Sequence, residues 1–319
     1  MNKKIIIVSG DPNSINSEII YKSWKKIDKS QKKNLYLIGN FDLIKSQLKR
    51  LNYPLKLEKV VNFENNVSSS KLKVIDVKTN FKNPFKLKKK DSSKYVISCL
   101  NYAHKLTQKQ NIKGIINCSI DKKLLKKNNI GVTEFLASKC NIKDNSYAML
   151  IWNKNISVSP ITTHIDLRQV SKNISSKKIV NKVKVINSWY KKNLRKKPKI
   201  AILGLNPHNS ELKRNSEEKK VIIPAILKLK KLRINVTGPH VADTIFINEY
   251  KHFDVIVGMY HDQVLAPFKT MFKFNAINIT LGLKYLRVSP DHGTSTRLIG
   301  KNQSNPESLL RCINFVNKF

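Results

Sequence analysis

Short runs of β-branched and aliphatic residues alternate along this chain with longer amphipathic segments. Such alternation is typical of βα units wound around a largely parallel sheet, so we predict an α/β fold. The expected strands are 5–8, 35–38, 73–77, 114–118, 148–152, 200–203, 254–257 and 276–279. The expected helices are 17–27, 43–51, 217–232, 242–251 and 307–316.

Proline adds detail to two of the expected helices. Pro224 should kink or divide the helix 217–232, because its ring removes a helical hydrogen bond. Pro306 suits the first helical position of the last helix, with Asn305 before it as the N-cap. We interpret the Lys/Ser/Asn-rich stretches 81–94 and 171–182 as surface connections.

Ligands of open α/β sheets bind beyond the carboxyl ends of the strands. Three segments that follow expected strands contain polar or conformationally special residues: 10–12, 204–208 and 259–263. Their placement agrees with an active site at the carboxyl ends of the strands.

The net charge of +40 raises the possibility of a nucleic-acid partner. Only eight of the 61 basic residues are arginine, although arginine is the preferred reader of phosphates and base edges. Lysine, asparagine and isoleucine are all abundant, which favours drift toward A/T-rich codons with lysines at solvated positions. We therefore expect no nucleic-acid partner, and a basic nucleic-acid-associated protein stays as an alternative that salt-sensitive binding would reveal.

Other sequence features argue against several classes of protein. The four cysteines (Cys99, Cys118, Cys140 and Cys312) form no Cys-x-x-Cys pair, and no apolar run approaches the roughly 20 residues of a membrane span. The apolar run 5–8 is too short for a signal peptide, so we expect a cytoplasmic protein. The P-loop, Gly-x-Gly-x-x-Gly and Gly-x-Ser-x-Gly motifs are all missing from the sequence.

Three of the seven histidines fall at or just beyond apolar runs: His164, His208 and His261. Three neutral imidazoles from separate loops can bind a metal ion and leave one position open for substrate or water. From their spacing alone, these residues could equally be three unrelated core histidines.

Five segments of the chain resemble the 4-phosphohydroxy-L-threonine dehydrogenase family of the vitamin B6 pathway. They read GLNPHNSE at 204–211, GPHVADT at 238–244, YHDQVLAPFK at 260–269, NITLGLK at 278–284 and RVSPDHGT at 287–294. The resemblance extends from Gly10 to Gly300; it is highly specific after Ala201 and thin before Ala148.

The resemblance implies an NAD-linked, or NADP-linked, oxidation of a phosphorylated hydroxy-amino acid, followed by loss of carbon dioxide. It implies a divalent cation (zinc, magnesium or cobalt) on His164, His208 and His261, in a site shared across a homodimer. The implied substrate contacts are Thr133, Lys269, Asn278 and Arg287.

Two further groups of polar residues are candidates for catalysis and cofactor binding. Asp243 and Asp262 could orient a histidine or accept a proton, or could instead be a helix-start residue and a structural hydrogen-bonder. The segment Asp291-His292-Gly293-Thr294 is expected to line the cofactor cleft, with an ordinary polar turn as the alternative.

By analogy with the isocitrate and isopropylmalate dehydrogenases, the resemblance also implies two α/β/α domains with a cleft between them. Residues 1–137 and 276–319, with both termini, would form the first domain. Residues 138–275 would form the second, with most of the metal ligands and the dimer interface.

The chain departs from the family pattern at several loops. Val132 stands where relatives have a histidine that contacts substrate, and the opening loop reads GDPNSINSE in place of GDPAGIGPE. The glycine-rich run expected after Glu211 is replaced by Leu212-Lys213-Arg214-Asn215. Two alternatives therefore stay open: a related dehydrogenase for another phosphorylated hydroxy acid, and a decayed, weakly active enzyme.

Overall fold

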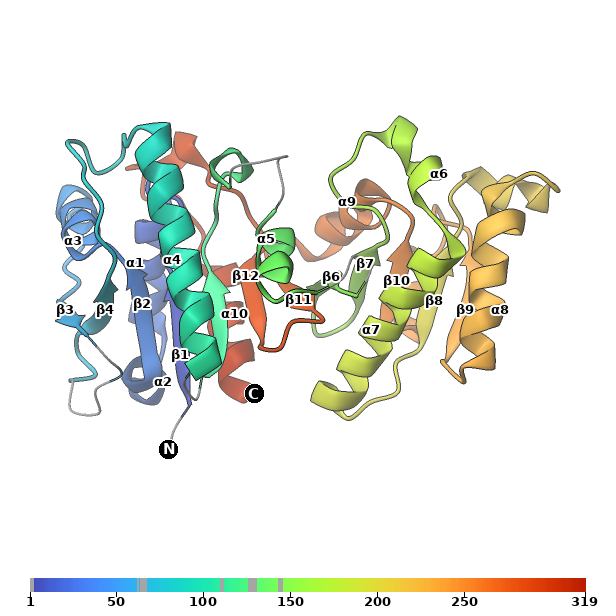
Figure 1. The fold of residues 1–319 in the computed structure, drawn as a ribbon, viewed down its shortest axis with the longest axis horizontal. Coiled ribbons are helices and arrows are strands. Elements are labelled where there is room, and N and C mark those ends of the chain that lie inside the picture. Colours follow the sequence, from blue (N-terminus) through green and yellow to red (C-terminus); the bar gives the residue numbers. More distant parts are fainter. Residues whose placement is uncertain (1–2, 62, 64–67, 110–111, 126–130, 143–145) are drawn as a thin grey trace. The chain divides into compact units, whose positions relative to one another are not determined.

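The computed structural model of this 319-residue chain describes every residue except 1–2, 62, 64–67, 110–111, 126–130 and 143–145 (Figure 1). The chain forms two compact units, of which the first comprises Met1–Cys140 with Lys284–Phe319 and the second Asn141–Leu283. Strands and helices alternate in both units, so the predicted α/β class is confirmed. The predicted domain boundaries and the predicted cleft stay predictions.

Parallel strands form the sheet of the first unit, in the order β3-β4-β2-β1-β5-β12. Strands β1 and β2 are almost wholly buried, which is why they read as continuous apolar runs rather than as alternating ones. The strands are β1 (Lys4–Val8), β2 (Leu35–Gly39), β3 (Leu57–Val60), β4 (Leu72–Asp76), β5 (Ile112–Asn117) and β12 (Arg287–Pro290).

Helices cover both faces of this sheet. The helical elements are α1 (Asn16–Lys26), α2 (Lys29–Asn34), α3 (Phe41–Arg50), α4 (Lys89–Lys109), α5 (Val132–Lys139) and α10 (Glu307–Lys318), with short turns η1 (Lys122–Leu124) and η6 (Thr296–Leu298). Helix α4 packs against β1, β2 and β5, and α10 packs against β12, β5 and α1. Figure 1 shows α4 in front of the strands and α10 behind them.

The second unit has a mixed sheet in the order β11-β6-β7-β10-β8-β9. Its β11–β6 and β6–β7 pairs are antiparallel, whereas β7, β10, β8 and β9 run parallel. The strands are β6 (Ala148–Trp152), β7 (Ser157–Pro160), β8 (Ile200–Leu203), β9 (Val236–His240), β10 (Val255–Gly258) and β11 (Ile277–Leu281).

The helical elements of the second unit are α6 (Val170–Asn173), α7 (Ser176–Leu194), α8 (Ile223–Lys231) and α9 (His261–Phe272), with short turns η2 (Leu167–Gln169), η3 (Pro207–Leu212), η4 (Glu218–Ile222) and η5 (Glu249–His252). Helix α9 packs on β7 and β10. Its residues Val264, Leu265 and Phe268 enter one buried apolar cluster with Val158 and Ile256. Helix α7 packs against α8, β6 and β11. None of the helices among the described residues has the length and apolar character that a bilayer crossing requires.

Several details of the predicted elements need correction. The stretch 171–182 is not a surface connection, because α7 begins at Ser176 and buries Ile179, Val183 and Ile186 at helical spacing between its lysines. Helix α4 likewise begins at Lys89, within the stretch 81–94 that we interpreted as a connection.

The predicted helix 242–251 is wrong. Only isolated turns close there, such as Ile247 N–H to Thr244 O at 2.9 Å, followed by η5. The adjacent side chains Ile245 and Phe246 are both buried, whereas Ile247 is exposed. The division at Pro224 is confirmed, since the π-type turn η4 ends at Ile222 and α8 begins at Ile223.

Lys73 is the most unusual member of the first unit's sheet. Its side chain is only 1% exposed, and its Nζ donates to the Lys33 carbonyl at 2.6 Å and lies 4.7 Å from the centroid of the Tyr36 ring. Burial, together with the nearby charge of Lys4, lowers the pKa of Lys73 to about 8.

The lowered pKa predicts a pH-dependent stability. Between pH 8 and 10.5 the unfolded chain binds more protons at this site than the folded chain, so the contribution of Lys73 to stability rises with pH. In urea titrations the wild type should therefore gain stability relative to Lys73→Met across this window. Lys56→Met, at an exposed position, should show no such trend, and a flat stability difference between the wild type and Lys73→Met would contradict the lowered pKa of Lys73.

Candidate active site

Three histidines of the second unit follow the carboxyl ends of three neighbouring strands. His164 comes after β7, His261 after β10 and His208 after β8. These strands pair in parallel in the order β7-β10-β8, so their carboxyl ends meet at one edge of the sheet. This pairing explains why the polar residues that follow these strands lie at one edge of the sheet.

Side-chain hydrogen bonds tie the three loops to one another. Thr162 Oγ1 donates to the Met259 carbonyl at 2.7 Å, which joins the loop after β7 to the loop after β10. Gln263 accepts from Met259 N–H at 2.7 Å and donates to the Gly204 carbonyl at 2.7 Å, which joins the loops after β10 and β8. Sequence reasoning missed the role of Gln263, although this residue lies inside one of the quoted motifs.

His164 and His261 lie close together. Their ring centroids are 5.7 Å apart, and two imidazoles on one zinc ion, with Zn–N bonds of about 2.0–2.1 Å, have centroids roughly 5–6 Å apart. The Nδ1 atom of His261 lies 2.6 Å from Asp262 Oδ1, which orients the ring and leaves Nε2 for a cation. These two side chains fit a divalent cation.

His208 does not complete a set of three ligands within the described chain. It is exposed on η3, and no group of three His, Cys, Asp or Glu side chains suited to a metal ion occurs among the described residues. The assignment of His208 as a ligand therefore stays a prediction.

The backbone around His208 adopts an uncommon left-handed conformation. Residues 208–212 all have φ between 48° and 56°, in the left-handed region that costs non-glycine residues roughly 1–2 kcal/mol each. Asn209 is buried within this turn and donates to the Pro239 carbonyl at 3.0 Å. A Cβ atom on Gly204 would lie 2.0 Å from Asn209 Oδ1, so any side chain at position 204 would require Asn209 to move. Strain of this kind concentrates at functional sites.

Glu218 holds the other side of this loop. Its side chain is 0% exposed, and Oε1 accepts from the N–H groups of Leu205 and Asn206 at 2.8 and 2.9 Å. Burial alone would raise the pKa of Glu218, but the hydrogen bonds from Asn206 and Leu205 outweigh it and the net shift is downward. The carboxylate thus keeps its charge while it fixes the segment before His208.

Arg287 and Thr133, two predicted substrate contacts, meet in the first unit. Arg287 is 3% exposed, and its Nη1 donates to Thr133 Oγ1 at 3.3 Å while its Nε donates to Asn117 Oδ1 at 2.6 Å. Burial lowers the pKa of Arg287 to about 10. Asn117 was not among the predicted residues; its place at the end of an expected strand was the only signal that could have indicated it.

The predicted cofactor segment lies at the carboxyl ends of the neighbouring strands β1, β5 and β12. His292 Nδ1 is 3.1 Å from Ser119 Oγ, which in turn donates to Asn16 Oδ1 at 3.1 Å. The Thr294 carbonyl accepts from Ile15 N–H at 3.2 Å, and Asp291 N–H donates to Ser308 Oγ at 2.9 Å. A Cβ atom at Gly293 would meet nothing within 4 Å, so the segment borders open space.

Asn16 shows what replaced a family glycine in the opening loop. Its Nδ2 donates to the carbonyls of Ser9 and Ser119 at 3.0 and 2.9 Å, and its φ is not positive. Asn16 therefore contributes hydrogen bonds to this loop, and its ability to adopt a left-handed backbone is not used.

The remaining predicted residues are Lys269 and Asn278, for substrate, and Asp243, for catalysis, all in the second unit. Lys269 is exposed on α9, and Asp243 is exposed in a turn. Asn278, on β11, has a buried Oδ1 atom without a hydrogen-bond partner among the described residues. A ligand that donates a hydrogen bond would satisfy this acceptor.

A protein-family comparison identifies the chain. The model described as pyridoxal phosphate biosynthetic protein PdxA matches residues 31–316. The chain belongs to the PdxA family. The family resemblance drawn from the five motifs is thereby confirmed.

Known PdxA relatives match this chain over almost its whole length. A 4-hydroxythreonine-4-phosphate dehydrogenase from Sulfurihydrogenibium sp. is 36% identical over 97% of this chain and 96% of its own. A protein from Oceanobacillus iheyensis, provisionally named D-threonate 4-phosphate dehydrogenase, is 30% identical over 98% of this chain and 97% of its own. The crystal structure of 4-hydroxythreonine-4-phosphate dehydrogenase from Klebsiella pneumoniae superposes with a TM-score of 0.84 at 27% identity, covering 99% of this chain and 97% of that one.

The hydrogen bonds of Glu218 predict a large effect of a small substitution. In Glu218→Gln an amide group replaces one carboxylate oxygen and would face the Asn206 amide, donor against donor. We expect a loss of about 1–3 kcal/mol in the free energy of unfolding at neutral pH, measured by urea denaturation. The pKa of Glu218 is lowered on folding, so this difference should shrink as pH falls below the ordinary value of 4.5. Glu211→Gln, at an exposed position, is the control, and equal stability of the two variants would refute the role of Glu218.

Proposed function

We propose that this PdxA-family chain oxidises 4-phosphohydroxy-L-threonine with a nicotinamide dinucleotide and releases carbon dioxide. The product would be 3-amino-2-oxopropyl phosphate, an intermediate of pyridoxal 5'-phosphate biosynthesis. The family match supports this activity, and the paired rings of His164 and His261 are the observation that carries the chemistry.

A divalent cation (zinc, magnesium or cobalt) would be held by His164 and His261, with His208 as the proposed third ligand. When bound, the cation supplies Lewis-acid chemistry at the substrate hydroxyl and the developing carbonyl, which favours hydride loss and decarboxylation. Asp262 is the positioning residue of this site, because its carboxylate accepts from His261 Nδ1–H. Asp243 is exposed and remains a candidate proton acceptor.

The charged groups of the substrate are matched by basic side chains among the predicted contacts. Arg287, held by Asn117 and Thr133, presents a guanidinium of fixed orientation, which suits the paired oxygens of a carboxylate or phosphate. Lys269 and Asn278 are the proposed contacts from the second unit. Lys269 offers a point charge, and the Asn278 Oδ1 atom offers an acceptor for the substrate amine or hydroxyl.

The dinucleotide is proposed to contact the segment 291–294. Asp291, His292, Gly293 and Thr294 lie at the carboxyl ends of parallel strands, which is where open α/β sheets bind such ligands. The open space beside Gly293 would admit the cofactor close to the backbone. We further propose a cytoplasmic homodimer that shares its active site.

A second candidate function is the oxidation of another phosphorylated hydroxy acid, such as D-threonate 4-phosphate. Two observations favour this candidate: Val132 in place of the family histidine, and the relative from Oceanobacillus iheyensis whose provisional name carries that substrate. A decayed enzyme would also carry Val132.

Nicotinamide reduction tests the proposed activity directly. Purified chain with dinucleotide, divalent cation and 4-phosphohydroxy-L-threonine should reduce the nicotinamide, and a chelator should stop the reaction. His261→Ala should lower kcat/KM at least about a hundredfold, because one cation ligand is lost. His252→Ala, on the exposed turn η5, should leave kcat/KM unchanged. Turnover of a different phosphorylated hydroxy acid, with none of this substrate, would sink the proposal in favour of the second candidate.

Val132→His distinguishes decay from a changed substrate. Val132 is partly exposed at the first position of α5, next to Thr133, so a histidine there can reach a ligand without repacking the core. If the natural valine at position 132 is a sign of decay, Val132→His should raise kcat/KM for 4-phosphohydroxy-L-threonine roughly tenfold to a hundredfold, as expected for one regained charged hydrogen bond. Unchanged or lower activity would instead mean that the pocket is fitted around valine.

A further inference from the structure

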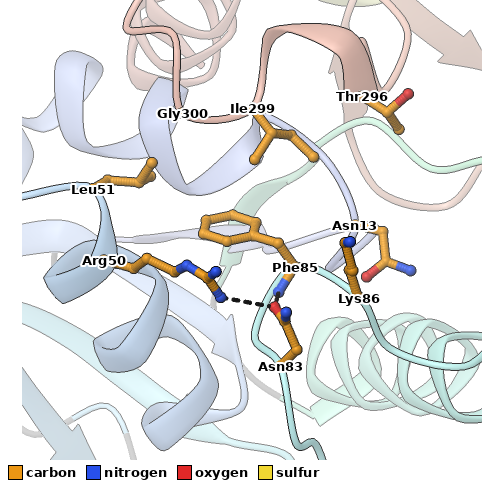
Figure 2. A pocket seen from close by; sticks show the side chains of 9 residues that line it. All are labelled: Asn13, Arg50, Leu51, Asn83, Phe85, Lys86, Thr296, Ile299 and Gly300. Atoms are coloured by element: carbon orange, nitrogen blue, oxygen red, sulfur yellow. Dashed lines mark hydrogen bonds between the residues drawn. The ribbon is translucent and has the colours of Figure 1, made fainter.

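A pocket of about 480 Å³ lies in the first unit (Figure 2). This volume falls in the range of small-molecule sites, roughly 300–1,000 Å³. The lining comes from the end of α3, the segment 83–86, the opening loop and the loop 296–300. The lining residues are Asn13, Arg50, Leu51, Asn83, Phe85, Lys86, Thr296, Ile299 and Gly300.

Hydrogen bonds around the pocket hold its walls in place. Asn13 and Leu87 exchange two bonds of 2.9 Å, Asn13 Nδ2 to the Leu87 carbonyl and Leu87 N–H to Asn13 Oδ1, which joins the opening loop to the segment 83–86. Tyr53 donates to Asn302 Oδ1 at 2.8 Å, which joins the chain just after α3 to the loop 296–300 and its continuation. Lys22 Nζ donates to the Asn302 carbonyl at 2.9 Å. The pocket is therefore preformed.

The pocket combines an apolar wall with two cations. Figure 2 shows the Phe85 ring at its centre, between Leu51 and Ile299, a surface on which a planar base can pack. Arg50 Nη1 donates to Asn83 Oδ1 at 3.0 Å, which holds the guanidinium at the pocket. Lys86 follows Phe85 and carries the second charge.

The lining residues, all of them described, include no aspartate or glutamate. This matters because dinucleotide sites that read a free ribose use a carboxylate to accept from its hydroxyl groups, whereas sites for a phosphorylated ribose use arginine. The pocket also adjoins the proposed cofactor segment: Thr296 lies two residues after Thr294, whose carbonyl accepts from Ile15 N–H, and Asn13 lies two residues before Ile15.

We propose that Arg50 and Lys86 select a dinucleotide whose adenosine ribose carries a phosphate, so that the chain prefers NADP to NAD. The preference rests on the proposed function, because it assigns a cofactor to the same dehydrogenase. The base packs on Phe85, and the ribose phosphate accepts charge-assisted hydrogen bonds from Arg50 and Lys86. The chain has only eight arginines among 61 basic residues, and one of them is fixed at this pocket.

Calorimetric titration of the purified full chain with 2′,5′-ADP and with 5′-AMP tests the preference without turnover. The two probes differ by the ribose phosphate alone. In about 0.15 M salt, which screens the general positive charge, we expect 2′,5′-ADP to bind at least about tenfold more tightly than 5′-AMP. NADP should exceed NAD by a similar factor.

Matched variants separate the two side chains from the general charge of the protein. Arg50→Gln and Lys86→Gln should each lower the ratio of the two probe affinities about tenfold. The controls Lys49→Gln and Lys88→Gln remove the same charge from exposed neighbours outside the lining, and they should leave the ratio unchanged. Each of three results would overturn the preference. In the first, the wild type binds the two probes equally; in the second, the variants and the controls lose equal amounts of the affinity ratio. In the third, Arg50→Gln loses NAD binding and NADP binding equally.

The outcomes also distinguish the preference from the activity. A chain that reduces NAD with 4-phosphohydroxy-L-threonine, yet binds 2′,5′-ADP no better than 5′-AMP, keeps the proposed function and overturns the preference. A chain that binds 2′,5′-ADP tightly through Arg50 and Lys86 but turns over no phosphorylated hydroxy acid supports the preference and overturns the proposed function.

Discussion

The direction of the parallel strands decides where chemistry can occur in each unit. Strands such as β1 and β10 satisfy their backbone groups within the sheet and bury their side chains, so they offer no polar group to a ligand. Polar groups collect instead where neighbouring strands end. In the second unit these ends carry His164, His261 and the turn of His208. In the first unit the ends of β1, β5 and β12 carry the opening loop, Ser119 and the segment 291–294.

Local sequence predicted the motifs and most strands, but it could not predict which loops meet. His164 and His261 are almost a hundred residues apart, and they approach because β10 inserts between β7 and β8 in the sheet, an order that no local pattern records. Helix α7 was missed for a compositional reason, because lysines between Ile179, Val183 and Ile186 obscured the apolar face. Arg287 was found through its motif, whereas its partner Asn117 depends on the pairing of β5 with β12.

Some of the abundant lysine and asparagine residues make buried contacts within the structure instead of lying on its surface. Lys73 caps backbone carbonyls from within the sheet, at the cost of a lowered pKa. Asn16, where relatives have glycine, links three backbone and side-chain groups at the ends of β1 and β5. Both buried residues thus form side-chain hydrogen bonds in the first unit.

The left-handed turn at residues 208–212 limits the paths by which this protein can evolve. Any residue that enters this segment must adopt a left-handed backbone, whatever its side chain contributes. Most substitutions there remove a side chain and leave the conformational penalty untouched, whereas glycine alone removes the penalty. A glycine at any of these five positions should therefore relieve part of the conformational penalty. Handedness, more than charge or polarity, sets the tolerance of this loop to mutation.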